Sequence, residues 1–151
     1  MFSKGSLVIY KNQPAVIVEC GEKFTINFVT GPKMQITSQN VRAKDILLLN
    51  ASPVSDIKAV VNFCKTLQEQ SQNFHTTLKE IYELYSEEKT KISIKELSEL
   101  VFGDFESTKS WGYYCFFKNS FLFEECSSET EIQFCCRTKE QIEILDPHAG
   151  S

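Results

Sequence analysis

Residues Ile92–Asp104, with the sequence ISIKELSELVFGD, carry a complete set of helix boundary signals. Ser93 and Glu96 form a capping box, in which each side chain satisfies a backbone N–H of the other residue. Gly103 is the expected C-terminal stop, because glycine adopts the left-handed conformation that ends many helices. The residues expected to face inward are Leu97, Leu100 and Val101. The stretch therefore predicts one helix of a three-helix, winged-helix-like segment.

Helical spacing continues on both sides of this stretch. Apolar residues upstream form two helical groups: Ile57, Val60, Val61, Cys64 and Leu67, then Phe74, Leu78, Ile81, Tyr82 and Tyr85. Ser71–Asn73 favours a break between two helices, although one long helix also fits the pattern. Downstream, the sequence predicts a helix over Thr108–Lys118 and a hairpin formed by Phe121–Glu125 and Glu131–Arg137. A final short helix is expected to begin at Thr138.

The first fifty residues instead carry short runs rich in Val, Ile and Phe, separated by turns that contain Gly or Pro. The runs are Ser6–Lys11, Ala15–Glu19, Phe24–Val29 and Lys33–Thr37, with Ile46–Leu49 as a closing strand. Short strands with tight turns predict a small, KOW-like β-barrel. We therefore expect an α+β chain, with a barrel at residues 1–50, a helical winged-helix (HTH-like) domain at 54–145 and a tail at 146–151.

Composition argues against a membrane, secreted or metal-binding protein. No apolar run approaches the roughly 20 residues of a spanning helix, and the N-terminus lacks the features of a signal peptide. The six cysteines are therefore expected to be free thiols in the cytoplasm. Adjacent Cys135 and Cys136 have poor spacing for metal ligands, and His75 and His148 are isolated, so no metal site is expected.

The charge distribution is asymmetric along the chain. Residues 1–50 carry six Lys or Arg and three Asp or Glu, which gives +3, whereas the remainder carries ten and seventeen, which gives −7. An RNA backbone would therefore meet the first fifty residues. The candidate RNA-binding residues are Lys4, Tyr10, Lys11, Lys23, Lys33, Arg42 and Lys44, with Tyr10 or a neighbouring aromatic residue stacking on a base. An ordinary solvated surface is the alternative reading of these lysines and arginines.

The predicted wing argues against DNA recognition. Its hairpin carries Glu124, Glu125, Glu129 and Glu131. Four carboxylates would repel phosphate groups, so DNA is an unlikely partner. The expected role of this region is to pack on the barrel, on a catalytic domain or on a partner protein.

Several motifs, taken in order, resemble a known family. They are KGSLV at residues 4–8, AVIV at 15–18, KELSELVFGD at 95–104, WGYYCFFKN at 111–119, FLFEE at 121–125 and RTKEQIEIL at 137–145. This order resembles the N-terminal region of ribonuclease II-type (RNB family) exoribonucleases, in particular the cyanobacterial and plastid branch. The resemblance extends over essentially the whole chain. Tyr113–Cys115 departs from the Tyr/Ala/His run that is usual in that branch.

The resemblance implies a processive 3′-to-5′ exoribonuclease that uses Mg²⁺, with its chemistry in a catalytic RNB domain outside this sequence. Two-metal chemistry needs several converging carboxylates, and the sequence offers no such cluster, so it predicts no catalytic residues, cofactors or metal ligands in this chain. The expected partners are single-stranded RNA and the catalytic domain in cis, or a partner protein. The expected location is the cytoplasm, or the stroma of an organelle in a plastid-bearing organism.

Two hypotheses follow from the sequence. The first is a non-catalytic, RNA-binding accessory region of a ribonuclease II-like exoribonuclease. The alternative is a winged-helix protein–protein interaction module with no RNA role, in which the barrel is only a platform.

Overall fold

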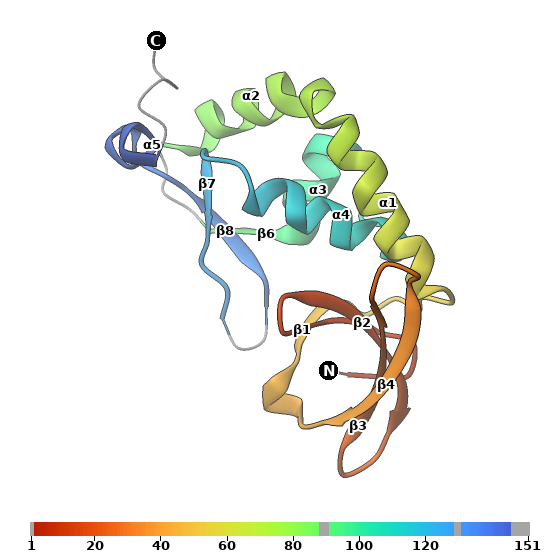
Figure 1. Ribbon diagram of the computed structural model, residues 1–151. Coiled ribbons are helices and arrows are strands. Elements are labelled where there is room, and N and C mark those ends of the chain that lie inside the picture. Colours follow the sequence, from red (N-terminus) through yellow and green to blue (C-terminus); the bar gives the residue numbers. More distant parts are fainter. Residues whose placement is uncertain (1, 88–90, 129–130, 146–151) are drawn as a thin grey trace.

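The computed structural model describes residues 2–87, 91–128 and 131–145 (Figure 1). The predicted tail at 146–151 lies outside these residues. The first half contains β1 (Leu7–Tyr10), β2 (Gln13–Cys20), β3 (Phe24–Thr30), β4 (Gln35–Val41), the 3₁₀ turn η1 (Ala43–Asp45) and β5 (Leu47–Asn50). The second half contains α1 (Ile57–Glu69), η2 (Ser71–Phe74), α2 (His75–Tyr85), β6 (Ile92–Ser93), α3 (Ile94–Phe102), α4 (Ser107–Lys118), β7 (Phe123–Glu125), β8 (Gln133–Cys136) and α5 (Lys139–Leu145). The chain is therefore α+β.

The five N-terminal strands form an antiparallel sheet in the order β4-β3-β2-β1-β5. The predicted barrel is wrong, because β4 and β5 are the two edges of this sheet and do not pair within the described residues. Short apolar strands separated by tight turns occur in open and closed sheets alike. The predicted strands overlap β1, β2, β3 and β5 closely, but the fourth was placed at Lys33–Thr37, whereas β4 is Gln35–Val41. The sequence also carried no signal for whether β4 pairs with β5.

The sheet curls where its register shifts. Irregularities lie between Leu7 and Val8 in the pairing of β1 with β5, and between Ile17 and Glu19 in the pairing of β2 with β3. An extra residue on one strand of a pair bends that strand and increases its twist. Figure 1 shows the resulting curved sheet at one end of the molecule, with α1 leading away from it towards α2.

Strand β1 lies between two hydrophobic cores. Its four residues are all buried, and successive side chains point to opposite faces of the strand. Leu7 and Ile9 contribute to a large core shared with the helices, whereas Val8 and Tyr10 contribute to a smaller core enclosed by the curled sheet. The other buried members of the smaller core are Ala15, Ile17, Ile26, Phe28, Val41 and Ile46. The sheet and the helices are therefore joined by shared apolar packing.

Helices α1 and α4 approach closely at Gly112. A Cβ atom at this position would lie 2.8 Å from Cδ2 of Phe63 and 3.3 Å from Cα of Cys64. Such a separation from the Phe63 ring is shorter than any ordinary van der Waals contact. The missing side chain therefore allows α4 to pack directly against α1.

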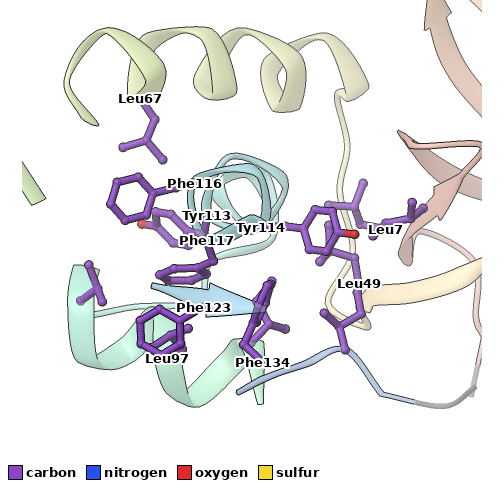
Figure 2. Close-up of a cluster of buried hydrophobic side chains, with 14 of the residues drawn as sticks. Leu7, Leu49, Leu67, Leu97, Tyr113, Tyr114, Phe116, Phe117, Phe123 and Phe134 are labelled. Carbon is purple, nitrogen blue, oxygen red and sulfur yellow. The ribbon is translucent and has the colours of Figure 1, made fainter. Parts of the chain in front are cut away.

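An aromatic cluster fills the space between α4, α3 and the smaller sheet, which has the order β6-β8-β7. The ring of Phe102 stacks on that of Tyr113 with 4.1 Å between centroids, and Phe117 packs edge-to-face on Phe134. Figure 2 shows the rings of Tyr113, Phe117 and Phe134 at α4, with Tyr114 extending towards Leu7 of the large sheet. The pairing of β7 with β8 confirms the predicted hairpin.

Helix α3 begins and ends where the sequence predicted. The hydroxyl of Ser93 accepts a hydrogen bond from the backbone N–H of Glu96, and Gly103 has a φ of 87°. The inward position predicted for Leu100 is wrong, because its side chain is 44% exposed. Ser98 is fully buried instead. The buried stripe of α3 is Ile94, Leu97, Ser98 and Val101.

Helices α1 and α2 are separate, as the break at residues 71–73 favoured, and η2 connects them. Polar contacts also fix the second half of the chain on the large sheet. The hydroxyl of Ser107, the first residue of α4, donates a hydrogen bond of 2.8 Å to the carbonyl of Ser52. Among the described residues, no helix is long and apolar enough to cross a bilayer.

Candidate nucleic-acid interface

The six basic residues predicted to contact RNA all lie on turns around the large sheet, and all six are exposed. Lys4 precedes β1, and Lys11 begins the β1–β2 turn, where it and Asn12 have φ values of 48° and 63°. Lys23 lies in the β2–β3 turn and Lys33 in the β3–β4 turn. The remaining two, Arg42 and Lys44, lie at η1, after β4.

Tyr10 does not have the position expected of a base-stacking residue. Its side chain is 5% exposed, and its ring packs against that of Phe28 with 5.7 Å between centroids. Its hydroxyl accepts a hydrogen bond of 2.9 Å from Nε2 of Gln39. A ring enclosed in this way cannot receive a base, so the stacking role predicted for Tyr10 does not fit the structure.

The sheet register divides the basic residues between two ends. Phe24 pairs with Val41, so the preceding Lys23 and the following Arg42 lie side by side at one end of the β3–β4 pair. Lys33 lies at the opposite end, beyond the pairing of Thr30 with Gln35. Because successive hairpin turns alternate between the ends of an antiparallel sheet, these cations do not form one compact patch.

One ion pair partly offsets the positive charge after β4. Nε of Arg42 lies 3.6 Å from Oδ2 of Asp45, and both side chains are exposed. The same carboxylate accepts a hydrogen bond of 3.1 Å from the backbone N–H of Arg42. Exposed ion pairs contribute about 0–1 kcal/mol, so phosphate can compete with Asp45 for the Arg42 guanidinium.

The segment from Gly31 to Lys44 contains Lys33, Arg42 and Lys44 but no Asp or Glu. It includes the whole of β4, whose side chains are mostly exposed. No other region of the large sheet combines three cations with an equally long stretch free of carboxylates. This segment therefore has the most favourable electrostatics for an anionic ligand.

The hairpin of the second half has a different character. Glu124 is exposed, and Glu125 accepts hydrogen bonds from the hydroxyls of Tyr114 and Ser127. Burial and the hydrogen bond to Glu125 raise the pKa of Tyr114 above its ordinary value. Glu129 lies outside the described residues. The carboxylate of Glu125 therefore has a structural role, which the sequence pattern did not reveal.

Residues 2–87, 91–128 and 131–145 contain no group of three His, Cys, Asp or Glu side chains that could hold a metal ion. His75 is exposed at the start of α2, and His148 lies outside the described residues.

All six cysteines are free thiols. The hydrogen bond with Cys64 on α1, together with burial, raises the pKa of Cys115 on α4. Burial and the charge of Cys135 raise the pKa of Cys136 to about 11. Raised pKa values disfavour the nucleophilic thiolate form of Cys115 and Cys136 at neutral pH.

Comparison of the chain with known protein families, with curated proteins and with solved structures finds no match. The resemblance to ribonuclease II-type enzymes accordingly stays a prediction from the motifs. The structure shows a cationic segment around β4, a buried aromatic residue, Tyr10, and a hairpin that carries carboxylates.

Proposed function

We propose that this chain is a non-catalytic accessory region of a ribonuclease II-like 3′-to-5′ exoribonuclease, and that it contacts single-stranded RNA through the large sheet. The observation that carries the proposal is the cationic segment from Gly31 to Lys44, which lies beside Lys23 and contains no carboxylate. The ordered motifs of the family support the assignment to this class of enzyme.

The mode of binding would be electrostatic. Phosphate contacts by Lys and Arg release counterions, which makes the affinity salt-dependent and largely independent of base sequence. Sequence-specific RNA recognition requires stacking or contacts to base edges. Since Tyr10 is buried, the large sheet would guide the RNA backbone and would not read bases through that ring.

The second half of the chain would act as a scaffold. Its hairpin presents Glu124 to solvent, and a carboxylate there repels phosphate. Helices α1 and α4 share the large core with β1 and β5, so they hold the sheet in a fixed position. RNA would approach from the sheet side, and the catalytic Mg²⁺ chemistry would belong to a separate catalytic domain.

Fluorescence anisotropy with a labelled 12-nucleotide single-stranded RNA, titrated at several salt concentrations, tests the proposal. The test variant replaces Lys23, Arg42 and Lys44 with Ala. The control variant replaces three exposed lysines of the helical half with Ala, namely Lys58, Lys65 and Lys95. Each lost phosphate contact lowers the salt slope by about 0.7, so the test variant should lose about 2 and the control almost nothing. Equal slopes for both variants would refute the RNA role.

A specific observation favours a second candidate, a protein–protein interaction module. Ile144 and Leu145 on α5 are 81% and 46% exposed. A groove of about 580 Å³ lies between α2 and α5, and its lining includes Tyr82, Leu122 and Ile142. Exposed apolar groups beside a groove are typical of protein contacts. Recovery of one stoichiometric protein partner in a nuclease-treated pull-down, without salt-sensitive RNA binding, would favour this module.

A further inference from the structure

Strand β4 is an open edge of the large sheet. Among the described strands it pairs only with β3, over the full length from Gln35 to Val41 and without a register shift (Figure 1). Natural proteins usually protect such edges with charges, prolines or bulges within the strand. The sequence of β4, QITSQNV, contains no charged residue and no proline. Its outward N–H and C=O groups are therefore positioned for pairing with another extended chain.

The side chains of β4 hold the strand in a regular conformation. The hydroxyl of Thr25 donates a hydrogen bond of 2.8 Å to the side chain of Asn40, and Ser38 donates one of 2.5 Å to that of Asn27. On the other face, Gln39 donates to the buried Tyr10 hydroxyl. These contacts all run towards the sheet, so they leave the outer backbone edge of β4 accessible.

The charges at the ends of β4 argue against pairing with a second copy of the chain. Antiparallel pairing of two β4 strands about Ser38 would place Lys33 opposite residue 43 of the other copy, between Arg42 and Lys44. Like charges placed opposite each other destabilise a strand pair. The same cations, together with the absence of any carboxylate from Gly31 to Lys44, would attract an acidic chain.

We infer that the β4 edge binds an extended acidic peptide segment as an additional antiparallel strand. Backbone hydrogen bonds would provide the pairing, as in other cases of strand addition. Carboxylates at one end of the peptide would contact Lys33, and those at the other end would contact Arg42 and Lys44. Seven residues at about 3.4 Å each give a strand of roughly 24 Å, so the peptide would contain about nine residues.

RNA is the competing ligand for this edge, and the backbone distinguishes the two. A phosphate chain would use Lys33, Arg42 and Lys44 but would not require the N–H and C=O groups of β4. The inference does not rest on the proposed RNA function, because peptide pairing can occur whether or not the chain binds RNA.

The probe is a fluorescein-labelled nine-residue peptide with two Glu at each end and alternating Val and Thr between them. Two control peptides carry N-methyl groups on alternate central residues, one in each of the two possible registers. Methylation in one register should weaken binding at least tenfold, and methylation in the other should have little effect. Equal binding by the parent peptide and both methylated peptides would overturn the inference.

Two further measurements complete the test. Replacement of Lys33 and Arg42 with Glu should weaken binding of the peptide at least tenfold, whereas replacement of the exposed Lys65 and Lys95 on α1 and α3 with Glu should not. Isotope-edited infrared spectra should show a new β-sheet signal from the bound peptide. If the chain binds RNA but not the peptide, the peptide inference is overturned and the proposed RNA role is not. If the chain forms concentration-dependent dimers that are lost in a Ser38→Pro variant, the edge binds a second copy instead.

Discussion

The side-chain amide of Asn50, at the end of β5, donates a hydrogen bond of 2.9 Å to the backbone carbonyl of Phe105, which precedes α4. The oxygen of the same amide accepts a hydrogen bond from the backbone N–H of Ser52. Asn50 is 6% exposed. One buried side chain thus connects the large sheet to the loop between α3 and α4.

Replacement of Asn50 with Leu should therefore destabilise the whole chain. The change removes the partner of the Phe105 carbonyl and of the Ser52 N–H. Ser52 is exposed, so water can reach its N–H, and the expected cost of about 1–3 kcal/mol comes mainly from the half-buried Phe105 carbonyl. For a chain of this size, Tm should fall by roughly 2–4 °C per kcal/mol. Thermal and urea denaturation measure the effect, with Asn62→Ala on the exposed face of α1 as the control. A Tm equal to that of the control would contradict the role given to Asn50.

The crossing of α1 and α4 predicts that Gly112→Ala is destabilising. The added Cβ would lie 2.8 Å from Cδ2 of Phe63, and overpacking of this kind typically costs about 1–3 kcal/mol. Phe63→Leu should restore part of the lost stability, because it removes the ring that the methyl group meets. Urea denaturation of both single variants and the double variant gives the coupling energy. Purely additive effects would show that Phe63 is not the obstacle.

The buried tyrosines predict a loss of stability at alkaline pH. Burial raises the pKa of Tyr113 and Tyr114, and hydrogen bonds to Asp104 and Glu125 raise them further. In the unfolded chain tyrosine ionises near pH 10, while the folded state still holds its protons. The unfolded state then binds fewer protons, so the free energy of unfolding falls as pH rises above about 10.

Thermal melts between pH 8 and pH 11.5 check this prediction. The slope of Tm against pH should become clearly negative above pH 10. Tyr114→Phe removes one of the ionising groups, so its slope should be shallower even if its Tm at pH 8 is lower. Identical slopes for Tyr114→Phe and the parent chain would remove Tyr114 as a cause.

The cysteines should differ strongly in reactivity. Cys20 is exposed, whereas burial and the neighbouring Cys135 raise the pKa of Cys136 to about 11. Only a thiolate is alkylated efficiently, so iodoacetamide at pH 7.5 should modify Cys20 first. The rate at Cys136 should continue to rise as the pH approaches 11. Peptide mapping by mass spectrometry gives the order, and labelling in urea should abolish the difference.

Local signals in the sequence predicted local structure well. Ser93, Glu96 and Gly103 determine both ends of α3 through contacts within a few residues, so no tertiary information is needed. The β7–β8 hairpin likewise pairs two strands that are close in the sequence. Leu100 and Ser98 show where this kind of prediction fails. Helical spacing predicts an apolar stripe on α3, but the packing of α3 against its neighbours decides that Ser98 is buried and Leu100 is exposed.

The features that depend on contacts between distant parts of the chain could not be predicted from the sequence. Whether β4 pairs with β5 depends on the curvature of the whole sheet, and the strand pattern does not encode it. Tyr10 was a candidate for stacking on a base, but its place in β1 directs its ring into the smaller core. The six cationic residues are exposed, but their separation onto two ends of the sheet follows only from the register of β3 with β4.

The burial of β1 on both faces bears on synthesis by the ribosome. Leu7 is translated well before Phe134, although both belong to the same core and lie more than a hundred residues apart. Val8 can be covered early by the remaining strands of the sheet. The opposite face of β1, with Leu7 and Ile9, is not fully covered until α4 and the hairpin have been translated. An apolar strand exposed for so long is a target for chaperones that recognise nascent chains, and slowing elongation after residue 50 should prolong its dependence on them.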